Sequence, residues 1–322
     1  MSYSAAEAEA LFGRMLDGGM GDAEIAATLI DLAERGETAN EIAGAARAMR
    51  VRLIPVKAPA GAIDVCGTGG DGHHTLNVST AVALVVAACG VPVAKHGNRA
   101  ASSKAGAADT LEALGLDMDR AVQTAETTLA ELGICFLFAG KHHPAMARIM
   151  PIRKALGRRT IFNLMGPLAN PAGVQRQLIG IARPAYVPIY ADALAQLGTE
   201  HSMIVSGDEG LDELSLAGGN EVAVIDPQGY AMQRISAADA GLAAAPVEAL
   251  RGGAADYNAA ALRRLLDGEQ TPYRDAVLLN AAGALIVAGS VTGWMEGVAL
   301  AAEAIDSGKA RTLLERWIAA VR

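Results

Sequence analysis

The stretch that decides the fold runs from residue 63 to residue 94 and reads IDVCGTGGDGHHTLNVSTAVALVVAACGVPVA. A short apolar run at residues 63–66 is followed by a glycine-rich loop and by a helix-like segment over residues 79–89. Gly90 ends that helix, and residues 91–94 have the pattern of the next strand. A strand, a loop, a helix and a second strand in this order form the repeating unit of a parallel sheet.

Outward from this unit, further short apolar runs predict strands at residues 134–138, 178–181, 203–205 and 222–225. Helix-like stretches separate most of them, which predicts an α/β fold with a mostly parallel central sheet flanked by helices. The first sixty residues read as helices only, because Ser4-x-x-Glu7 and Thr38-x-x-Glu41 match capping boxes. A proline-containing linker at residues 55–59 follows, so we expect a helical domain over residues 1–61 and an α/β domain over residues 62–322.

Composition narrows the class of protein. The chain has 322 residues, a formal net charge of −8 and 52% hydrophobic residues. An acidic chain is a poor ligand for nucleic acid, whose phosphates dominate such binding. Three cysteines stand far apart in apolar runs, which favours buried side chains in a reducing compartment over metal or redox chemistry. The N-terminus lacks a signal-peptide pattern and the apolar run at residues 81–88 is too short to cross a bilayer, so we expect a cytoplasmic protein without membrane contact.

The glycine-rich loop has four glycines in the six positions 67–72, directly after a strand. Such a loop lets backbone N–H groups approach an anion, although a tight turn between strand and helix has the same composition. Oxygen-bearing side chains follow at the expected helix start: Thr75, Asn77, Ser79 and Thr80. A helix N-terminus attracts anions and a serine there can ligate a hard cation, whereas capping accounts for one of the four.

A second polar loop leaves the next strand and carries two positive charges, an imidazole, an amide and two hydroxyls. It consists of Lys95, His96, Gly97, Asn98, Arg99, Ala100, Ala101, Ser102 and Ser103. Open α/β sheets bind ligands at the carboxyl ends of their strands, which favours a binding role over a solvated charged loop.

Four segments, in this order between Gly67 and Ser215, resemble the anthranilate phosphoribosyltransferase family: GTGGDGHHTLNVST, KHGNRAASS, HHPAMARIMPIRKALGRRTIFNLMGPLANP and GLDELS. The resemblance implies a nucleoside phosphorylase/phosphoribosyltransferase-like fold, with the helical domain completed by about residues 153–177 and the active site between the domains. It also implies transfer of the phosphoribosyl group of phosphoribosyl pyrophosphate to the amine of anthranilate, a step of tryptophan biosynthesis. The products are N-(5-phosphoribosyl)anthranilate and pyrophosphate. A homodimer and two Mg²⁺ ions per active site are implied as well.

Residue by residue, the same resemblance implies three sets of contacts. Residues matching the phosphoribosyl pyrophosphate site are Gly67, Gly70, Asp71, Thr75, Asn77, Ser79, Thr80, Lys95, His96, Gly97, Asn98, Arg99, Ala100, Ala101, Ser102, Ser103 and Ala107, the last at a position where the family usually has serine. Residues matching the anthranilate site are Gly67, Asn98 and Arg153. Residues matching the magnesium site are Ser79, Asp212 and Glu213.

The chemistry of this reaction fits these residue types. Displacement at the anomeric carbon passes through an oxocarbenium-like state, and a polyanion must leave, so charge neutralisation is the main requirement. An arginine forks onto a carboxylate, which fits Arg153 to the acid group of anthranilate. The amine is already neutral, so no strong base is required; His96 orients the substrate, accepts a proton late or is a structural loop histidine.

Two other functions are open to such a sequence. A pyrimidine nucleoside phosphorylase shares the general architecture but would not need the Asp212–Glu213 pair. A catalytically silent relative that binds nucleotides or nucleic acid would be expected to lose the glycine loop or the acidic pair, and this chain has both.

Overall fold

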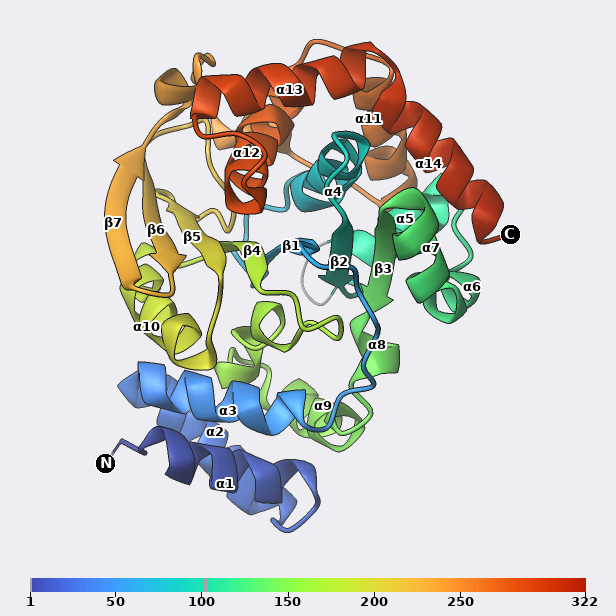
Figure 1. Cartoon of the computed structure of the whole chain (residues 1–322). Coiled ribbons are helices and arrows are strands. Elements are labelled where there is room, and N and C mark those ends of the chain that lie inside the picture. The colour runs from blue at the N-terminus through green and yellow to red at the C-terminus, as the bar shows by residue number, and fades with distance from the viewer. Residues whose placement is uncertain (1, 101–103) are drawn as a thin grey trace.

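The computed structural model describes residues 2–100 and 104–322, and it is built around one seven-stranded sheet with the order β3-β2-β1-β4-β5-β6-β7 (Figure 1). The strands are β1 Ile63–Gly67, β2 Val93–Gly97, β3 Ile134–Phe138, β4 Arg176–Gly180, β5 His201–Gly207, β6 Asn220–Asp226 and β7 Gly229–Ile235. The first five are parallel, whereas β6 and β7 extend the sheet antiparallel to β5 and to each other. The α/β class and the mostly parallel sheet are confirmed, with β7 as a strand that the sequence analysis missed.

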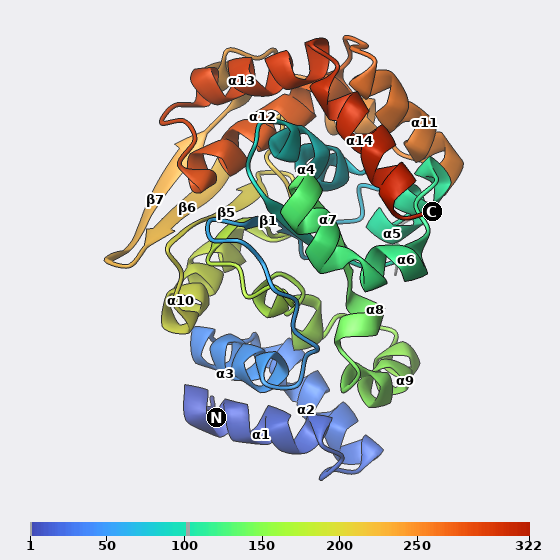
Figure 2. The same ribbon diagram turned by 45° about the vertical axis from the view of Figure 1, so that its right-hand side comes forward.

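One face of the sheet is covered by helices that come mostly from the C-terminal part of the chain (Figures 1 and 2). They are α4 Val78–Ala88, α5 Ala107–Leu114, α11 Ala255–Leu266, α12 Pro272–Ala288, α13 Trp294–Asp306 and α14 Lys309–Ala320. Helix α4 is apolar on nearly all sides and is buried from Thr80 to Ala87, because it packs on both the strands and α12. This packing fixes the start of α4 at the end of β1.

The other face carries the N-terminal helices, which form a second core with segments from the middle of the chain. Helices α1 Ala5–Leu16 and α3 Ala39–Arg50 begin at the predicted capping boxes of Ser4 and Thr38, and α2 Asp22–Arg35 lies between them. Helix α9 Met146–Leu156 packs against α1 and α2, and α10 Val187–Leu197 joins α3 to β5 and β6. Helix α3 therefore packs on α10, and α10 in turn packs on β5 and β6 of the sheet.

Shorter elements complete the molecule. At the β3 edge lie α6 Met118–Gln123, α7 Ala125–Leu132 and α8 Ala139–His142. The 3₁₀ turns are η1 Ile161–Asn163, η2 Pro167–Ala169, η3 Pro184–Tyr186, η4 Ala237–Ala240 and η5 Val247–Leu250. Within the described residues, no helix combines the length and the apolar composition that crossing a bilayer requires.

Candidate active site

A cavity of about 370 Å³ opens at the carboxyl ends of β1 and β2, beside the start of α4. Its walls come from several stretches of the chain: the glycine loop with the helix start that follows it, the second polar loop, Ala139, the stretch from Arg153 to Pro167, and Asp212 with Glu213. The structure thus places the residues named from the sequence around one space, apart from Ala101, Ser102 and Ser103, which lie outside the described residues, and Thr80, which does not line it.

The acidic pair lies directly against the glycine loop and the helix start. The backbone N–H of Gly69 donates to Oδ2 of Asp212 at 2.6 Å, and the N–H of Ser79 donates to Oε1 of Glu213 at 3.0 Å. Two glycines make this approach possible, because a Cβ on Gly67 or on Gly180 would overlap atoms of Asp212. The acidic segment can therefore cross the ends of β1 and β4 only where both strands lack a side chain.

The carboxyl groups in this corner are poorly solvated and close together. Burial, followed by the charge of Asp71, raises the pKa of Asp212 to about 7. Burial and the charge of Asp212 raise the pKa of Glu213 well above its usual range. Oε2 of Glu213 is buried and has no hydrogen-bond partner among the described residues. An unpartnered carboxylate oxygen beside a second carboxyl and a serine hydroxyl fits a hard cation such as Mg²⁺.

Lys95 is the buried positive charge nearest to this corner. Its side chain is almost fully covered, and Nζ donates to the carbonyl oxygen of Val65 at 2.8 Å and to Oγ of Ser79 at 3.3 Å. The third ammonium hydrogen is available for another acceptor, since a lysine carries three donors. Lys95 thus brings one positive charge to the hydroxyl at the start of α4.

The second polar loop is held mainly by Asp109 of α5. Its Oδ2 accepts the N–H groups of Ala100 and Gly106 at 2.9 and 2.8 Å. The guanidinium of Arg99 pairs with Asp109 and Glu112, so it is already neutralised by two carboxylates. Asn98 and Ala107 line the cavity, and Ala107 brings no hydroxyl to it. Arg99 also lines the cavity, but its charge is already paired with carboxylates of α5.

Three polar residues near the helix start are engaged in packing. Thr75 forms an isolated bridge with Arg251. The amide of Asn77 accepts hydrogen bonds from Thr110 and Asn258, which ties α4 to α5 and α11. Thr80 is buried, and its hydroxyl has no partner in the part of the chain that the structure describes. Thr75 and Asn77 still line the cavity, so the same residues that border it also hold its walls together.

Arg153 approaches the cavity from the opposite side. It donates to Oδ1 of Asn163 at 3.3 Å, and its Cζ lies 5.8 Å from the ring centre of Phe162. Burial lowers the pKa of Arg153, and no carboxylate of residues 2–100 or 104–322 forms an ion pair with it. A half-buried guanidinium that faces a cavity without a counter-charge is arranged to receive an anion.

His96 forms a compact polar network between the strands and the residues near Arg153. Its Nδ1 lies 2.9 Å from the carbonyl oxygen of Gly166, and its Nε2 lies 3.2 Å from Nε2 of His143. Burial and the neighbouring His143 lower the pKa of His96 to about 3, so the imidazole is neutral at physiological pH. The geometry therefore favours a neutral, orienting imidazole over a strong base.

Asp64, the second residue of β1, hydrogen-bonds to this network and is completely buried. Its Oδ1 accepts the backbone N–H of His96 at 3.1 Å, and its Oδ2 accepts the side-chain amide of Asn170 at 2.8 Å. Asn170 also donates to the carbonyl oxygen of Ala94. One carboxyl group therefore joins β1, β2 and the turn that follows η2.

Comparison with known proteins shows which family this chain belongs to. A glycosyl transferase family α/β domain matches residues 60–311, and the helical bundle domain of a glycosyl transferase family matches residues 2–52. The anthranilate phosphoribosyltransferase of Novosphingobium aromaticivorans is 72% identical over 316 residues, which cover 98% of this chain and 96% of that protein. The chain belongs to the anthranilate phosphoribosyltransferase family.

Other members of this family agree in sequence and in structure. The anthranilate phosphoribosyltransferase of Sphingopyxis alaskensis is 73% identical over 313 residues, which cover 97% of this chain and 94% of that protein. The crystal structure of the Thermus thermophilus enzyme has a TM-score of 0.94 at 44% identity and covers 100% of this chain and 97% of that one. The Saccharomyces cerevisiae enzyme in complex with PRPP and Mg has a TM-score of 0.88 at 29% identity, covering 99% and 93% of the two chains.

Several residues of the site were not singled out from the sequence. Asn163 and Gly166 line the cavity beside Arg153, and Gly180 makes room for Asp212. Arg159 donates to the carbonyl oxygens of Gly70 and Gly69 at 3.0 and 3.4 Å, and so supports the glycine loop from outside. All but Gly180 stand in or next to the quoted family segments, but only the fold shows which of them reach the cavity.

Proposed function

We propose that the residues around this cavity carry out the reaction of the family, in which the phosphoribosyl group of phosphoribosyl pyrophosphate is transferred to the amine of anthranilate. The products are N-(5-phosphoribosyl)anthranilate and pyrophosphate. The observation that carries the assignment is the cavity itself, which is lined both by a buried acidic pair and by Arg153, an arginine without an ion pair among the described residues. A cation held by the acidic pair suits a phosphate donor, and the guanidinium suits an aromatic acid.

The donor is assigned to the wall formed by the glycine loop, the start of α4 and the second polar loop. Backbone N–H groups of a glycine-rich turn and of a helix N-terminus bind phosphate oxygens without a formal charge. The N–H groups of Gly69 and Ser79 are excluded, because they already donate to Asp212 and Glu213. Lys95 adds a charge next to Ser79, where a phosphate oxygen can accept its remaining hydrogen. The side chain of Arg99 is assigned to holding this loop, because Asp109 and Glu112 already neutralise it.

Asp212, Glu213 and Ser79 are the proposed ligands of magnesium, with two ions in each site. When bound, magnesium neutralises the charge that develops on the leaving pyrophosphate. The raised pKa values of the two carboxyls support this, because a cation relieves the repulsion that disfavours their ionised forms. Asp71 adds a third negative group to this corner.

Anthranilate is assigned to the space between Arg153, Asn98 and Gly67. The guanidinium of Arg153 forks onto the carboxylate and turns the amine toward the sugar. The neutral amine attacks without prior deprotonation. His96 serves as a neutral orienting group, because its two ring nitrogens already face the carbonyl oxygen of Gly166 and Nε2 of His143.

The remaining assignments concern the whole protein. We propose a cytoplasmic homodimer formed through the N-terminal helices, with residues 1–61 and part of the stretch 153–177 as the helical domain. Sedimentation equilibrium tests the dimer, and a variant with charged residues on the outer face of α1 tests the surface.

One assay tests the proposed function. Anthranilate is fluorescent and its phosphoribosyl adduct is much less so, so purified protein with both substrates and Mg²⁺ should cause the emission to fall. EDTA should stop the decay. Emission that stays constant, together with turnover of thymidine and phosphate, would instead identify a pyrimidine nucleoside phosphorylase.

A further inference from the structure

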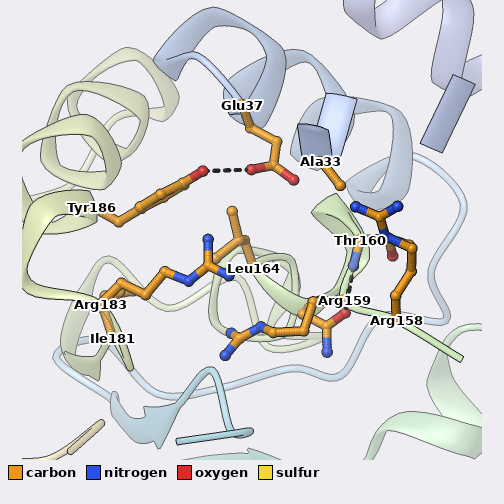
Figure 3. A pocket seen from close by; sticks show the side chains of 10 residues that line it. Ala33, Glu37, Arg158, Arg159, Thr160, Leu164, Ile181, Arg183 and Tyr186 are labelled. Atoms are coloured by element: carbon orange, nitrogen blue, oxygen red, sulfur yellow. Dashed lines mark hydrogen bonds between the residues drawn. The ribbon is translucent and has the colours of Figure 1, made fainter. Parts of the chain in front are cut away.

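A second pocket, of about 260 Å³, lies between the helical layer and the ends of the sheet, next to the active-site cavity (Figure 3). It is bordered by α2, by the turn before α3, by the segment that follows α9 and by the segment between β4 and α10. Its polar lining includes Glu37, Arg158, Arg159, Thr160, Asn163 and Arg183. The function proposed above leaves this pocket without a ligand.

The pocket is positively charged at its centre. Figure 3 shows Arg159 and Arg183 reaching toward the middle from opposite sides, and the charge of Arg183 contributes to lowering the pKa of Arg159, after burial. Arg158 instead pairs with Glu34. The carboxylate in the lining, Glu37, accepts the hydroxyl of Tyr186 at 2.8 Å. Among the described residues, neither Arg159 nor Arg183 forms an ion pair with a carboxylate.

A neutral donor stands beside these charges. Thr160 is 3% exposed, lines the pocket, and has a hydroxyl without a hydrogen-bond partner in the described part of the chain. A buried hydroxyl left unpaired costs free energy, so such a group usually meets a ligand or water. Two guanidiniums and a hydroxyl without a partner among the described residues thus line one pocket, and together they form a donor set suited to an oxyanion.

We propose that this pocket is a second anion site, which takes an oxyanion of the phosphate class through Arg159, Arg183 and Thr160. The site is separate from the substrate cavity but meets it at two residues: Asn163 lines both, and Arg159 also holds the carbonyl oxygens of Gly69 and Gly70. The anion comes either from the pyrophosphate product or from free phosphate in solution. Both sources offer the same oxygens to the pocket.

Calorimetric titration of the full-length protein with inorganic phosphate tests the site. Saturating phosphoribosyl pyrophosphate and Mg²⁺, without anthranilate, keep the substrate cavity filled, so remaining phosphate binding reports the second pocket. This step rests on the proposed function, and binding of the donor is therefore measured first. Arg183→Gln and Thr160→Val should each weaken phosphate binding, the arginine variant by about tenfold or more. Arg311→Gln removes an equal charge on the exposed face of α14 and should change nothing.

Separate outcomes distinguish the site from the reaction. If the donor fails to bind, the proposed function is wrong, and the difference between wild type and Arg183→Gln in phosphate alone still tests the pocket. Phosphate binding that is absent, or equal in wild type and both variants, overturns the proposal. The source is identified by repeating the titration with magnesium pyrophosphate and by following pyrophosphate release in a single turnover. The product is identified if the wild type binds pyrophosphate more tightly than phosphate and if Arg183→Gln releases pyrophosphate more slowly than the wild type. The free anion is identified if the wild type binds phosphate more tightly and the release rate of Arg183→Gln is unchanged.

Discussion

The backbone N–H of Ser79 donates to Oε1 of Glu213, although 134 positions separate the two residues in the chain. This contact joins the start of α4 to the acidic segment that crosses the ends of β1 and β4. It leaves Oε2 of Glu213 free of partners among the described residues, in a buried position beside Asp212. The proposed magnesium site depends on that arrangement.

Glu213→Gln should raise the Mg²⁺ concentration needed for half-maximal velocity by about tenfold or more. The amide keeps the shape and the hydrogen bond from Ser79 but removes the charge that a cation requires, and a charged partner contributes about 1.5–3 kcal/mol. Velocity measured over a magnesium titration checks this. Asp208→Asn is the control, because Asp208 is exposed and pairs with Arg234. An unchanged magnesium requirement in Glu213→Gln would remove this residue from the metal site.

Arg153→Lys should raise the KM for anthranilate by about ten- to a hundredfold, with little change in the KM for the donor. Lysine keeps the charge but cannot form the two parallel bonds of a guanidinium to a carboxylate. Initial rates with each substrate varied in turn give both constants. The adjacent and exposed Lys154 offers the control Lys154→Ala. Equal effects on both KM values would indicate a loss of folding or of cavity shape instead.

Asp212→Asn should change how the stability of the metal-free protein depends on pH. The folded carboxyl has a pKa of about 7, whereas the unfolded one titrates near its ordinary value of about 3.9. The folded state thus holds a proton that the unfolded state has lost, and stability falls as the pH rises between those values. Melting temperatures of wild type and variant should agree below about pH 3.9 and diverge as the pH rises, and the variant should melt clearly higher at pH 8.

Two additions make this test specific. Asp226→Asn, at the exposed turn between β6 and β7, should follow the wild-type curve at every pH. Added Mg²⁺ should raise the melting temperature of the wild type more at pH 8 than at pH 5, because the cation favours the ionised carboxyls. Parallel curves for wild type and Asp212→Asn would contradict the shifted pKa.

Gly180→Ala should destabilise the protein by about 1–3 kcal/mol or more, because a methyl group there overlaps the backbone of Asp212, which cannot rotate away. The Mg²⁺ requirement should rise as well, since the acidic segment must shift. Denaturant unfolding and a magnesium titration measure the two effects. Gly21→Ala is the control, because Gly21 has a φ of −75° and no atom lies within 4 Å of an added Cβ. Equal stability of both variants would show that the segment adapts.

The strands that can be predicted from the sequence are those with continuous apolar runs. The cores of β1 and β3 were placed because both faces of these strands are buried. Strand β7 was missed because five of its seven residues are exposed, so its sequence carries neither an apolar run nor a clear alternation. A strand can be predicted from an apolar run or from alternating apolar residues, and both patterns arise from burial of the strand and not from its backbone geometry.

Only some features of the candidate site can be predicted from the sequence. The glycine loop and the second polar loop are contiguous motifs that residue type and spacing indicate, whereas the acidic pair Asp212–Glu213 is indicated only by the family resemblance. The partners of Arg99 and the contact of Arg159 with Gly70 depend on which segments the fold brings together, across 89 positions in the second case. Charge and residue type could not distinguish an arginine that holds a loop from one that awaits a ligand. Only the neighbouring carboxylates make that distinction.

The carboxyl group of Asp64 has a consequence for how the two halves of the reaction are spaced. Its two oxygens hold the strand that carries Lys95 and the turn that follows the Arg153 side of the cavity. Under the proposed function, the spacing of the two binding walls therefore depends on a buried carboxyl that is assigned to neither substrate. We expect Asp64→Glu to shift β2 relative to the turn at Asn170, and so to change the separation of the two substrates.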